Sequence, residues 1–411
     1  MEILRGFKDI LPTDIEKWHK LEETARNTLE SFGYKEIRTP LLEKTRLFAR
    51  GVGEDTDIVE KEMYTFLDKS NESVTLRPEG TAGVVRAYID NHLKNLPYKK
   101  YYYIGAMFRY ERPQKGRLRQ FHQIGVEVFG IDNPSIDAEI VYLDKTMLEK
   151  LKIGDLRIEI NNIGCEKCRP GYIKKLQEYF TQHQDKLCED CKRRLNKNPL
   201  RILDCKNKGC KTVAKDAPKI TDYACDECKN HYNNVKAKLQ SLNIEFIENP
   251  YLVRGLDYYT KFVFEIITDK LGAQGTVSAG GRYDGLIEQL GGKATPGIGF
   301  ASGCERLIEL MDEEKELLFD YYIANLGEDD YALDIASKLI NLTNKRIYVE
   351  YEKRSLKSMM KKADRMDARF VVIVGENEKN KNTVLVKDMK NSTQNEYDLK
   401  TFLDNEVKRW L

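Results

Sequence analysis

Arginine stands beside glycine and acidic residues in four separate segments of the chain, residues 108–123, 252–259, 278–285 and 297–306. A guanidinium fixed on a strand can bind a phosphate through two hydrogen bonds, so these segments suggest a phosphate-containing ligand. The paired glycines before Arg282 would let the backbone approach that ligand closely, or could form a turn between a strand and a helix. The arginines of 108–123 could instead form ion pairs on a surface hairpin. The sequence has neither a P-loop nor a G-x-G-x-x-G turn, so a nucleotide would be held by other contacts.

Eight of the nine cysteines lie close together in the sequence, and three of their four pairs have C-x-x-C spacing. They are Cys165, Cys168, Cys188, Cys191, Cys205, Cys210, Cys225 and Cys228. In a reducing compartment this spacing indicates tetrahedral thiolate ligation of zinc rather than disulfides, and eight thiolates could form two sites. The alternative is that these cysteines are small buried residues near helix ends. Cys304 lies among small residues and is expected to pack in a core.

The cysteine-rich segment is also basic. Residues 165–243 hold 18 Lys and Arg against 10 Asp and Glu, whereas the whole chain is nearly balanced, with 68 against 66. A basic segment in an acidic body suggests contact with a polyanion, but a solvated lysine-rich surface explains the charge equally well.

Length and composition narrow the class of protein. The chain has 411 residues, which at about 150 residues per domain predicts two to three domains. With 41% hydrophobic and 33% charged residues, the chain has the composition of a globular protein. No apolar run reaches the roughly 20 residues of a membrane span, and residues 1–9 lack a signal-peptide core, so we expect a cytoplasmic protein with no membrane partner. Collagen, coiled-coil rods and disulfide mini-proteins are excluded.

The elements that must position these residues alternate between helix and strand. Apolar residues from Ile15 to Phe32 repeat at helical spacing, and helices are also expected at 81–93 and 136–151. Strand-like runs are residues 36–39, 63–67, 74–76, 101–109, 120–129, 156–162, 244–247 and 258–267. On the strand 120–129, Gln123, Gly125 and Glu127 would share one face. Strands on both sides of the cysteine-rich segment predict one mainly antiparallel sheet that this segment interrupts, with helices on one face.

The pattern changes near residue 318. Residues 321–325, 346–351 and 370–374 are strand-like, and residues 331–342 and 355–366 are helical. This alternation predicts a separate small α/β domain with a parallel or mixed sheet, joined by an acidic linker at 312–316. We therefore expect an α+β protein. Its parts are a catalytic domain in two pieces, 1–164 and 244–316, an insertion at 165–243, and a C-terminal domain at 317–411.

The arginine segments resemble known motifs. Residues 108–123 resemble motif 2 of the class II aminoacyl-tRNA synthetases, and residues 297–306 resemble motif 3. Residues 252–259 and 278–285 resemble the two signature peptides of the histidyl-tRNA synthetase family, and residues 76–81 its histidine-binding turn. Pro40 stands where motif 1 places a proline at the dimer interface. The resemblance extends from Arg5 over nearly the whole chain.

The resemblance implies a role for each matching residue. It implies histidine binding by Glu79, Thr81, Arg109, Gln123, Glu127, Arg254, Tyr258 and Tyr259. It implies ATP binding by Arg109, Glu111, Arg117 and Arg306, and catalysis by Arg109, Arg254 and Arg306. Glu79 and Thr81 would hold the α-amino group and Glu127 and Tyr259 the imidazole. Arg109 and Arg254 would bind the α-phosphate and Arg306 the γ-phosphate.

The resemblance also implies an activity. A homodimer would activate L-histidine with ATP and Mg²⁺ and transfer it to the 3′ end of tRNA(His). The alternative is the synthetase-like regulatory subunit of ATP phosphoribosyltransferase, which typically lacks the 254–259 peptide and often the C-terminal domain, both present here. A pure zinc-ribbon nucleic-acid binder would leave the four arginine segments unexplained.

Two regions depart from the family pattern. The C-terminal region resembles the anticodon-binding domain, but Lys353 replaces a usual glycine and Met359 a common glutamine. Lys353, Arg354, Lys357 and Lys361 still form a basic face suited to phosphates. Residues 199–204 resemble the family's insertion domain, yet some members lack its cysteines, so the resemblance does not settle metal binding.

Overall fold

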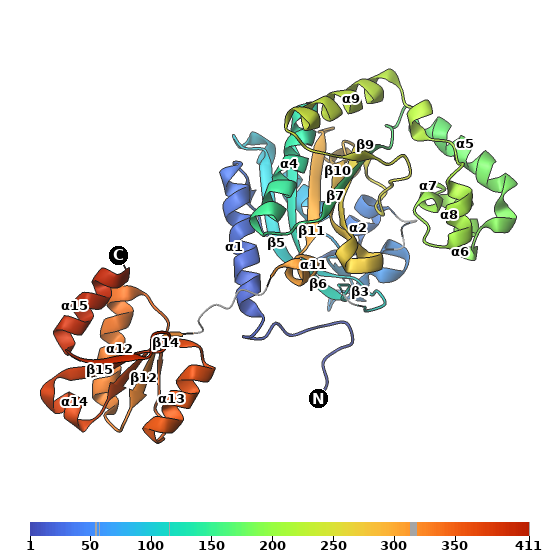
Figure 1. Ribbon diagram of the computed structural model, residues 1–411. Helices are drawn as coiled ribbons and strands as arrows, with labels where there is room; N and C mark the ends of the chain where they lie inside the picture. The colour runs from blue at the N-terminus through green and yellow to red at the C-terminus, as the bar shows by residue number, and fades with distance from the viewer. Residues whose placement is uncertain (54–55, 57, 115, 313–318, 411) are drawn as a thin grey trace. The chain divides into compact units, whose positions relative to one another are not determined.

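The computed structural model describes residues 1–411 except 54, 55, 57, 115, 313–318 and 411. The chain forms two compact units, Met1–Asp312 and Glu313–Leu411 (Figure 1). The expected linker at 312–316 and the expected boundary between residues 316 and 317 fall, apart from Asp312, outside the described residues. No helix in the described part of the chain is long and apolar enough to span a membrane.

An eight-stranded sheet forms the centre of the first unit, in the order β1-β5-β6-β11-β10-β9-β7-β8. The strands are β1 Lys35–Glu36, β5 Lys100–Phe108, β6 Gln120–Phe129, β7 Leu156–Asn162, β8 Ile247–Glu248, β9 Thr260–Thr268, β10 Thr276–Arg282 and β11 Gly297–Gly303. The six inner strands pair antiparallel, and only the short edge strands β1 and β8 pair parallel with their neighbours. Because β7 precedes the insertion and β8 and β9 follow it, the prediction of one interrupted antiparallel sheet is confirmed.

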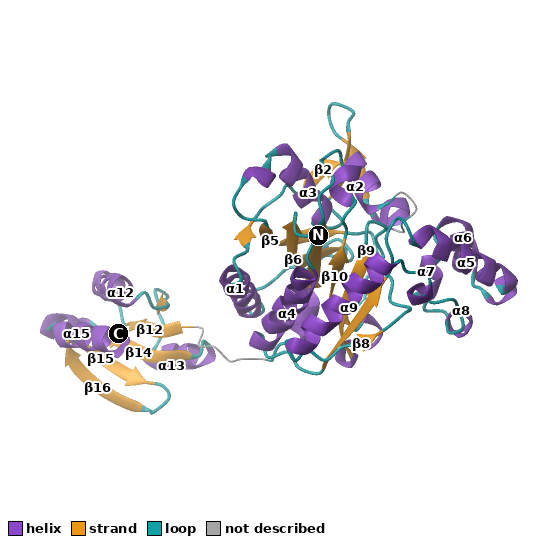
Figure 2. Cartoon of the chain, turned by 90° about the horizontal axis from the view of Figure 1, so that it is seen from above, coloured by secondary structure: helices purple, strands orange, loops and turns teal. Residues whose placement is uncertain are grey.

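Helices cover both faces of this sheet. The helices of the first unit outside residues 165–225 are α1 Ile15–Ser31, α2 Thr45–Val52, η1 Ile58–Glu62, α3 Thr81–Asp90, η2 Leu93–Asn95, α4 Pro134–Lys150, α9 Asp226–Ser241, η5 Asp269–Gln274, α10 Leu286–Gln289 and α11 Cys304–Leu310. Figure 2 shows α1, α4 and α9 on one side and α2 and α3 on the other. Apolar residues of α1, α4, α9 and α11 form the main core with the sheet, and Val84, Val85 and Tyr88 of α3 pack on the opposite face. The expectation of helices on one face was therefore wrong at the end covered by α3.

The insertion has a helical core of its own. Its elements are α5 Arg169–Gln182, η3 Gln184–Lys186, α6 Glu189–Lys197, α7 Leu200–Leu203, α8 Lys208–Ala214 and η4 Ile220–Asp222. Leu176, Phe180 and Ile202 are buried together in it. Helix α9, by contrast, contributes Tyr232 and Leu239 to the main core of the sheet, although residues up to 243 were assigned to the insertion.

Two smaller sheets complete the fold. In the first unit, β2 Leu42–Lys44, β3 Tyr64–Leu67 and β4 Ser73–Leu76 form an antiparallel sheet in the order β2-β4-β3. The second unit contains β12 Phe319–Asn325, α12 Asp329–Thr343, β13 Ile347–Val349, α13 Leu356–Arg365, β14 Ala368–Val374, α14 Glu376–Lys381, β15 Thr383–Asp388, β16 Thr393–Asp398 and α15 Leu399–Trp410. Strands β13, β12 and β14 are parallel, as the βαβαβ pattern predicts, and β15 and β16 extend the sheet antiparallel.

Candidate active site

A cavity of about 370 Å³ lies on the sheet face opposite α1 and α4. Ten of the eleven residues expected to bind histidine or ATP line it: Glu79, Thr81, Arg109, Glu111, Arg117, Gln123, Arg254, Tyr258, Tyr259 and Arg306. The sheet order brings them together, because β6, β11, β10 and β9 are neighbours and the four arginine segments lie on these strands or at their ends. The predicted segments, which are far apart in the sequence, thus form one site.

At one end of the cavity, Glu79 caps helix α3. Its Oε2 accepts the Thr81 N–H at 2.8 Å and its Oε1 accepts the Ala82 N–H at 2.8 Å. Burial raises the pKa of Glu79, and these two N–H donors oppose that rise. The cap fixes the position of the carboxylate, which lines the cavity and can bind an ammonium group.

Glu127 is the expected site residue that does not line the cavity. It is 1% exposed, and its oxygens accept hydrogen bonds from the hydroxyls of Thr81, at 2.7 Å, and Tyr283. Burial raises the pKa of Glu127 to about 8, despite these two donors. Since Thr81 and Tyr283 both line the cavity, Glu127 lies one hydroxyl behind it, and a ligand reaches its carboxylate by displacing one of them.

Tyr103 and Tyr283 also line the cavity, and neither was predicted as a site residue. The Tyr103 ring lies against Gly80 and Gly125, where an added Cβ would be 2.2 and 2.1 Å from Tyr103 Cζ. Only glycine fits at both positions. Tyr283 belongs to the segment 278–285, which resembles a signature peptide, so the sequence could have identified it. Tyr103 lies in a strand-like run that matches no motif.

Four guanidinium groups also line the cavity. Arg109 Nε donates to the Pro78 carbonyl at 2.8 Å, and Arg306 Nε donates to the Gly116 carbonyl at 3.1 Å. Arg117 contacts the Glu111 carboxylate, and Arg254 pairs with Glu265 on β9.

This crowding of positive charge favours an anionic ligand. Burial lowers the pKa of Arg306, and the charges of Arg117 and Arg109 lower it further. Burial likewise lowers the pKa of Arg109. An anion bound among these groups would relieve both the desolvation and the repulsion.

Arg282 belongs to a different environment. It is fully buried and binds both oxygens of Asp137, at 2.7 to 3.1 Å, away from the residues that line the cavity. Asp137 also contacts His231 Nε2 at 3.1 Å. The Arg282 side chain therefore ties β10 to α4 and α9, whereas Ser278, Ala279 and Tyr283 of the same segment line the cavity.

Besides Glu111 Oε2, which is ion-paired with Arg117, two buried polar atoms at the cavity lack a hydrogen-bond partner among the described residues. They are Gln123 Oε1, an acceptor, and Arg254 Nε, a donor. Buried polar atoms in folded proteins are almost always paired, so an unpaired donor and acceptor at one cavity indicate a polar ligand. They lie on β6 and in the segment 252–259, both expected to bind histidine.

The insertion also reaches the cavity. Lys206, between α7 and α8, is one of its lining residues, and no sequence signal marked it. A neighbouring cleft of about 210 Å³ lies between η1 and the helices α6 and α7. Its basic residues are Lys61, Arg193, Arg194, Lys197 and Arg201.

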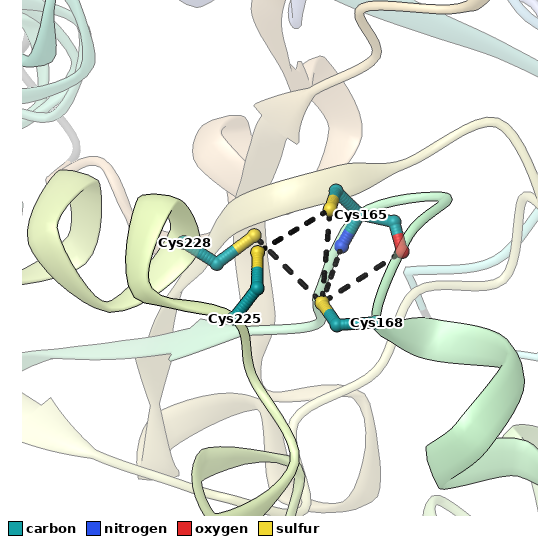
Figure 3. A group of neighbouring side chains, drawn as sticks. All are labelled: Cys165, Cys168, Cys225 and Cys228. Atoms are coloured by element: carbon teal, nitrogen blue, oxygen red, sulfur yellow. Dashed lines mark hydrogen bonds between the residues drawn. The ribbon is translucent and has the colours of Figure 1, made fainter.

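The eight cysteines form two separate groups of four. The base group is Cys165, Cys168, Cys225 and Cys228, and the outer group is Cys188, Cys191, Cys205 and Cys210; in each, the Sγ atoms all lie within 4.8 Å of one another. Figure 3 shows the base group, in which Cys165 and Cys168, between β7 and α5, meet Cys225 and Cys228 at the start of α9. Its Sγ–Sγ distances include 3.7 Å for Cys165–Cys168, 3.8 Å for Cys165–Cys225 and 3.9 Å for Cys168–Cys228.

These sulfur distances fit a tetrahedral metal site. A tetrahedron of sulfurs about 2.3 Å from zinc has edges of about 3.8 Å, whereas a disulfide bond is about 2.05 Å long. In the outer group, Cys188 and Cys205 are 3.9 Å apart. Burial raises the pKa of Cys165, but N–H donors from Cys168 and Lys167 outweigh burial and lower that pKa to about 7. The sulfur geometry of both groups therefore fits four thiolate ligands around one metal ion.

Comparison with known proteins gives the same family along the whole chain. A family model described as "Histidyl-tRNA synthetase" matches residues 6–307, and one described as "Anticodon binding domain" matches residues 320–409. A histidine–tRNA ligase of Thermodesulfovibrio yellowstonii is 51% identical over 98% of this chain and 97% of its own length. One from Halothermothrix orenii is 49% identical over 98% of each chain. The crystal structure of apo S. aureus histidyl-tRNA synthetase superposes with a TM-score of 0.81 at 37% identity, covering 99% of this chain and 100% of that one.

Proposed function

The chain belongs to the histidyl-tRNA synthetase family, and from that premise we infer that it is a histidine–tRNA ligase. It activates L-histidine with ATP to histidyl-adenylate, releasing pyrophosphate, and transfers the histidyl group to the 3′ end of tRNA(His), releasing AMP. The observation that carries this proposal is that a carboxylate, Glu79, and four guanidinium groups line one cavity. The alternative of a regulatory subunit is not supported, because the 254–259 peptide and the C-terminal domain are both present.

The geometry suggests how adenylation proceeds. The histidine carboxylate is already a nucleophile and attacks the α-phosphorus, so no catalytic base is needed. Negative charge grows on the phosphate oxygens in the transition state, and the fixed guanidiniums of Arg109 and Arg254 stabilise it there. Arg306 and Arg117 hold the outgoing pyrophosphate oxygens. Glu111 and Glu305 also line the cavity. Their carboxylates offer the oxygen ligands that Mg²⁺ prefers, and Mg²⁺ would neutralise charge on the β- and γ-phosphates.

Other residues of the cavity select histidine. Glu79 and Thr81 bind the α-amino group, and Gln123, Tyr258 and Tyr259 enclose the ring. Glu127 accepts the imidazole N–H in place of one of the hydroxyls it now binds. A side chain without this donor leaves the buried carboxylate unpaired, which makes its binding unfavourable.

The basic insertion and the C-terminal domain are suited to tRNA. Arg193, Lys197 and Arg201 of the insertion line the cleft, and Lys206 of the insertion lines the substrate cavity. Lysine and arginine there supply salt-dependent contacts to a phosphate backbone. We assign this role to the part of the insertion that α5–α8 form, and anticodon binding to residues 317–411.

A second copy of the chain would cover an apolar surface near Pro40. Leu41, just before the small sheet, and Leu42, Phe66 and Leu67 within it are 41 to 64% exposed. Exposed apolar side chains are typical of an interface, so we propose a homodimer that uses this region. The nine free cysteines fit a reducing compartment, which favours a cytoplasmic location.

The two cysteine groups fit zinc. Each presents four sulfurs at distances close to the edge of a thiolate tetrahedron. We propose one zinc ion per group, so a chain purified without chelators should contain two equivalents by elemental analysis.

ATP–pyrophosphate exchange tests the proposed activity. The purified protein should exchange labelled pyrophosphate into ATP only when histidine is present. A folded, zinc-replete protein that shows no histidine-dependent exchange would contradict the proposal.

A further inference from the structure

We propose that the metal at the base cysteine group holds Tyr259 in the histidine pocket, and that Arg169 is the positioning residue that connects the two. The proposal rests on the function proposed above, because it assigns Tyr259 to the histidine site. The base group lies where the chain leaves the sheet and where it returns: Cys165 and Cys168 follow β7, and Cys225 is the N-cap of α9.

The backbone between the base group and the pocket is densely hydrogen-bonded. The Gly164 carbonyl, next to Cys165, accepts the Lys261 N–H at 2.8 Å and the Thr260 hydroxyl at 3.1 Å. The Ile163 N–H donates to the Lys261 carbonyl at 2.8 Å. The segment that ends at the first ligand is therefore paired with the segment that directly follows Tyr259.

Arg169 completes the connection. It follows the second ligand, Cys168, and its guanidinium donates to the carbonyls of Ile163, Gly164 and Tyr259. Three acceptors on two segments fix the guanidinium plane, and that plane in turn fixes the backbone of Tyr259. Burial lowers the pKa of Arg169.

The ligands at the start of α9 are also linked to the backbone around Gly164. Asn162, which is 3% exposed, donates its amide to the Cys228 carbonyl at 3.2 Å and accepts the Gly164 N–H at 2.9 Å. Gly164 has a φ of +72°, and a Cβ there would lie 3.1 Å from Cys168 Sγ. Only glycine gives the chain this turn beside the sulfur.

The outer group has a different relation to the cavity. It lies in the core of α5–α8, and it approaches the site through side chains, by the packing of Val253 on that core and by Lys206, the neighbour of Cys205. Loss of its metal should loosen the insertion and disturb the histidine pocket far less. The two groups thus provide matched controls for one another.

Cys225 is the ligand to change, because it is distant in sequence from both Arg169 and Tyr259. Cys225→Ser should lose one of two zinc equivalents and raise the KM for histidine in pyrophosphate exchange at least tenfold, with the KM for ATP changed less than threefold. Cys225→His keeps four ligands and should restore both zinc and the histidine KM. Cys188→Ser, in the outer group, should also lose one zinc but change the histidine KM less than threefold.

A measurement independent of activity comes from Arg169. Arg169→Ala should keep both zinc ions, yet hydrogen–deuterium exchange at the Lys261 amide should become at least tenfold faster, with Arg169→Lys between it and wild type. The same faster exchange is expected in Cys225→Ser and not in Cys188→Ser. The proposal is overturned if Cys225→Ser loses zinc with unchanged exchange at Lys261, if the outer variant matches the base variant, or if wild type holds no zinc. Absence of pyrophosphate exchange in wild type would instead contradict the proposed function and leave the hydrogen-exchange result to decide this proposal.

Discussion

Replacing Arg254 separates its role in catalysis from its role in an ion pair. Its guanidinium lines the cavity, pairs with Glu265, and keeps one buried nitrogen, Nε, that no described residue binds. Removing one group aimed at charge that develops in the transition state lowers a rate by roughly 10² to 10³, or about 2.7–4 kcal/mol. Arg254→Ala should therefore reduce histidine-dependent pyrophosphate exchange at least 100-fold, with a smaller effect on histidine affinity.

The same substitution also leaves Glu265 without its partner. The two side chains are 19% and 15% exposed, so an unpaired carboxylate there would lower the free energy of unfolding by up to about 3 kcal/mol. Glu265→Gln removes that charge and keeps an oxygen for the Thr276 hydroxyl, which donates to Glu265 Oε2 at 3.0 Å. The double variant should recover the melting temperature and not the exchange rate. If the double variant recovers exchange to within threefold of wild type, the catalytic role of Arg254 is refuted.

Three further results are expected. Glu127→Ala should weaken histidine binding far more than ATP binding by calorimetry, and equal losses would make Glu127 structural rather than selective. Burial raises the pKa of Asp144 to about 7 against hydrogen bonds from Ser278 and Ser302, so the folded state holds a proton that the unfolded state releases. The stability this proton contributes is present below about pH 4 and is lost as the pH rises to about 7. In thermal melts, Asp144→Asn should therefore lose less stability over this pH range than wild type. An equal loss in the variant and wild type would contradict the raised pKa of Asp144. Arg193→Glu in the basic cleft should raise the KM for tRNA(His) several-fold and leave pyrophosphate exchange unchanged, and an unchanged KM across a salt series would exclude this cleft as a tRNA contact.

In the C-terminal unit, some strands can be predicted from the local sequence and others cannot. Its three parallel strands follow from apolar runs such as Phe370–Val374, because a strand buried on both faces is apolar throughout. The hairpin of β15 and β16 was not predicted. Strand β16 is exposed along nearly its whole length, so its composition carries no period-two signal.

Two central strands were not predicted because they are rich in glycine. Residues 278–285 and 297–306 contain several glycines, which are rare in strands, yet they form most of β10 and β11. An added Cβ at Gly280 would lie 2.2 Å from the Gly299 carbonyl oxygen, and one at Gly299 would lie 2.3 Å from Glu127 Oε2. These glycines make room for close backbone approach and for a buried carboxylate, which only the packed sheet reveals.

The candidate site likewise contains residues that the sequence predicts and residues that only the fold reveals. Residues in recognisable motifs, such as Arg109 and Arg306, were predictable because motif and position coincide. The enclosure of Glu127, the reach of Lys206 and the pairing of Cys165 with Cys225 depend on contacts over 46 residues or more, and no local pattern encodes them. The place of α9 in the main core was also not predictable, and it means that deleting residues 165–242 would remove Tyr232 and Leu239 from the core.

Charging of tRNA(His) by the intact protein tests the proposed function most directly. With ATP, Mg²⁺ and labelled histidine, we expect label at the 3′ end of tRNA(His), no charging by other amino acids, and loss of at least 99% of the rate in Arg254→Ala. A folded, zinc-replete protein that does not attach histidine to tRNA(His), or that attaches another amino acid equally well, would contradict it.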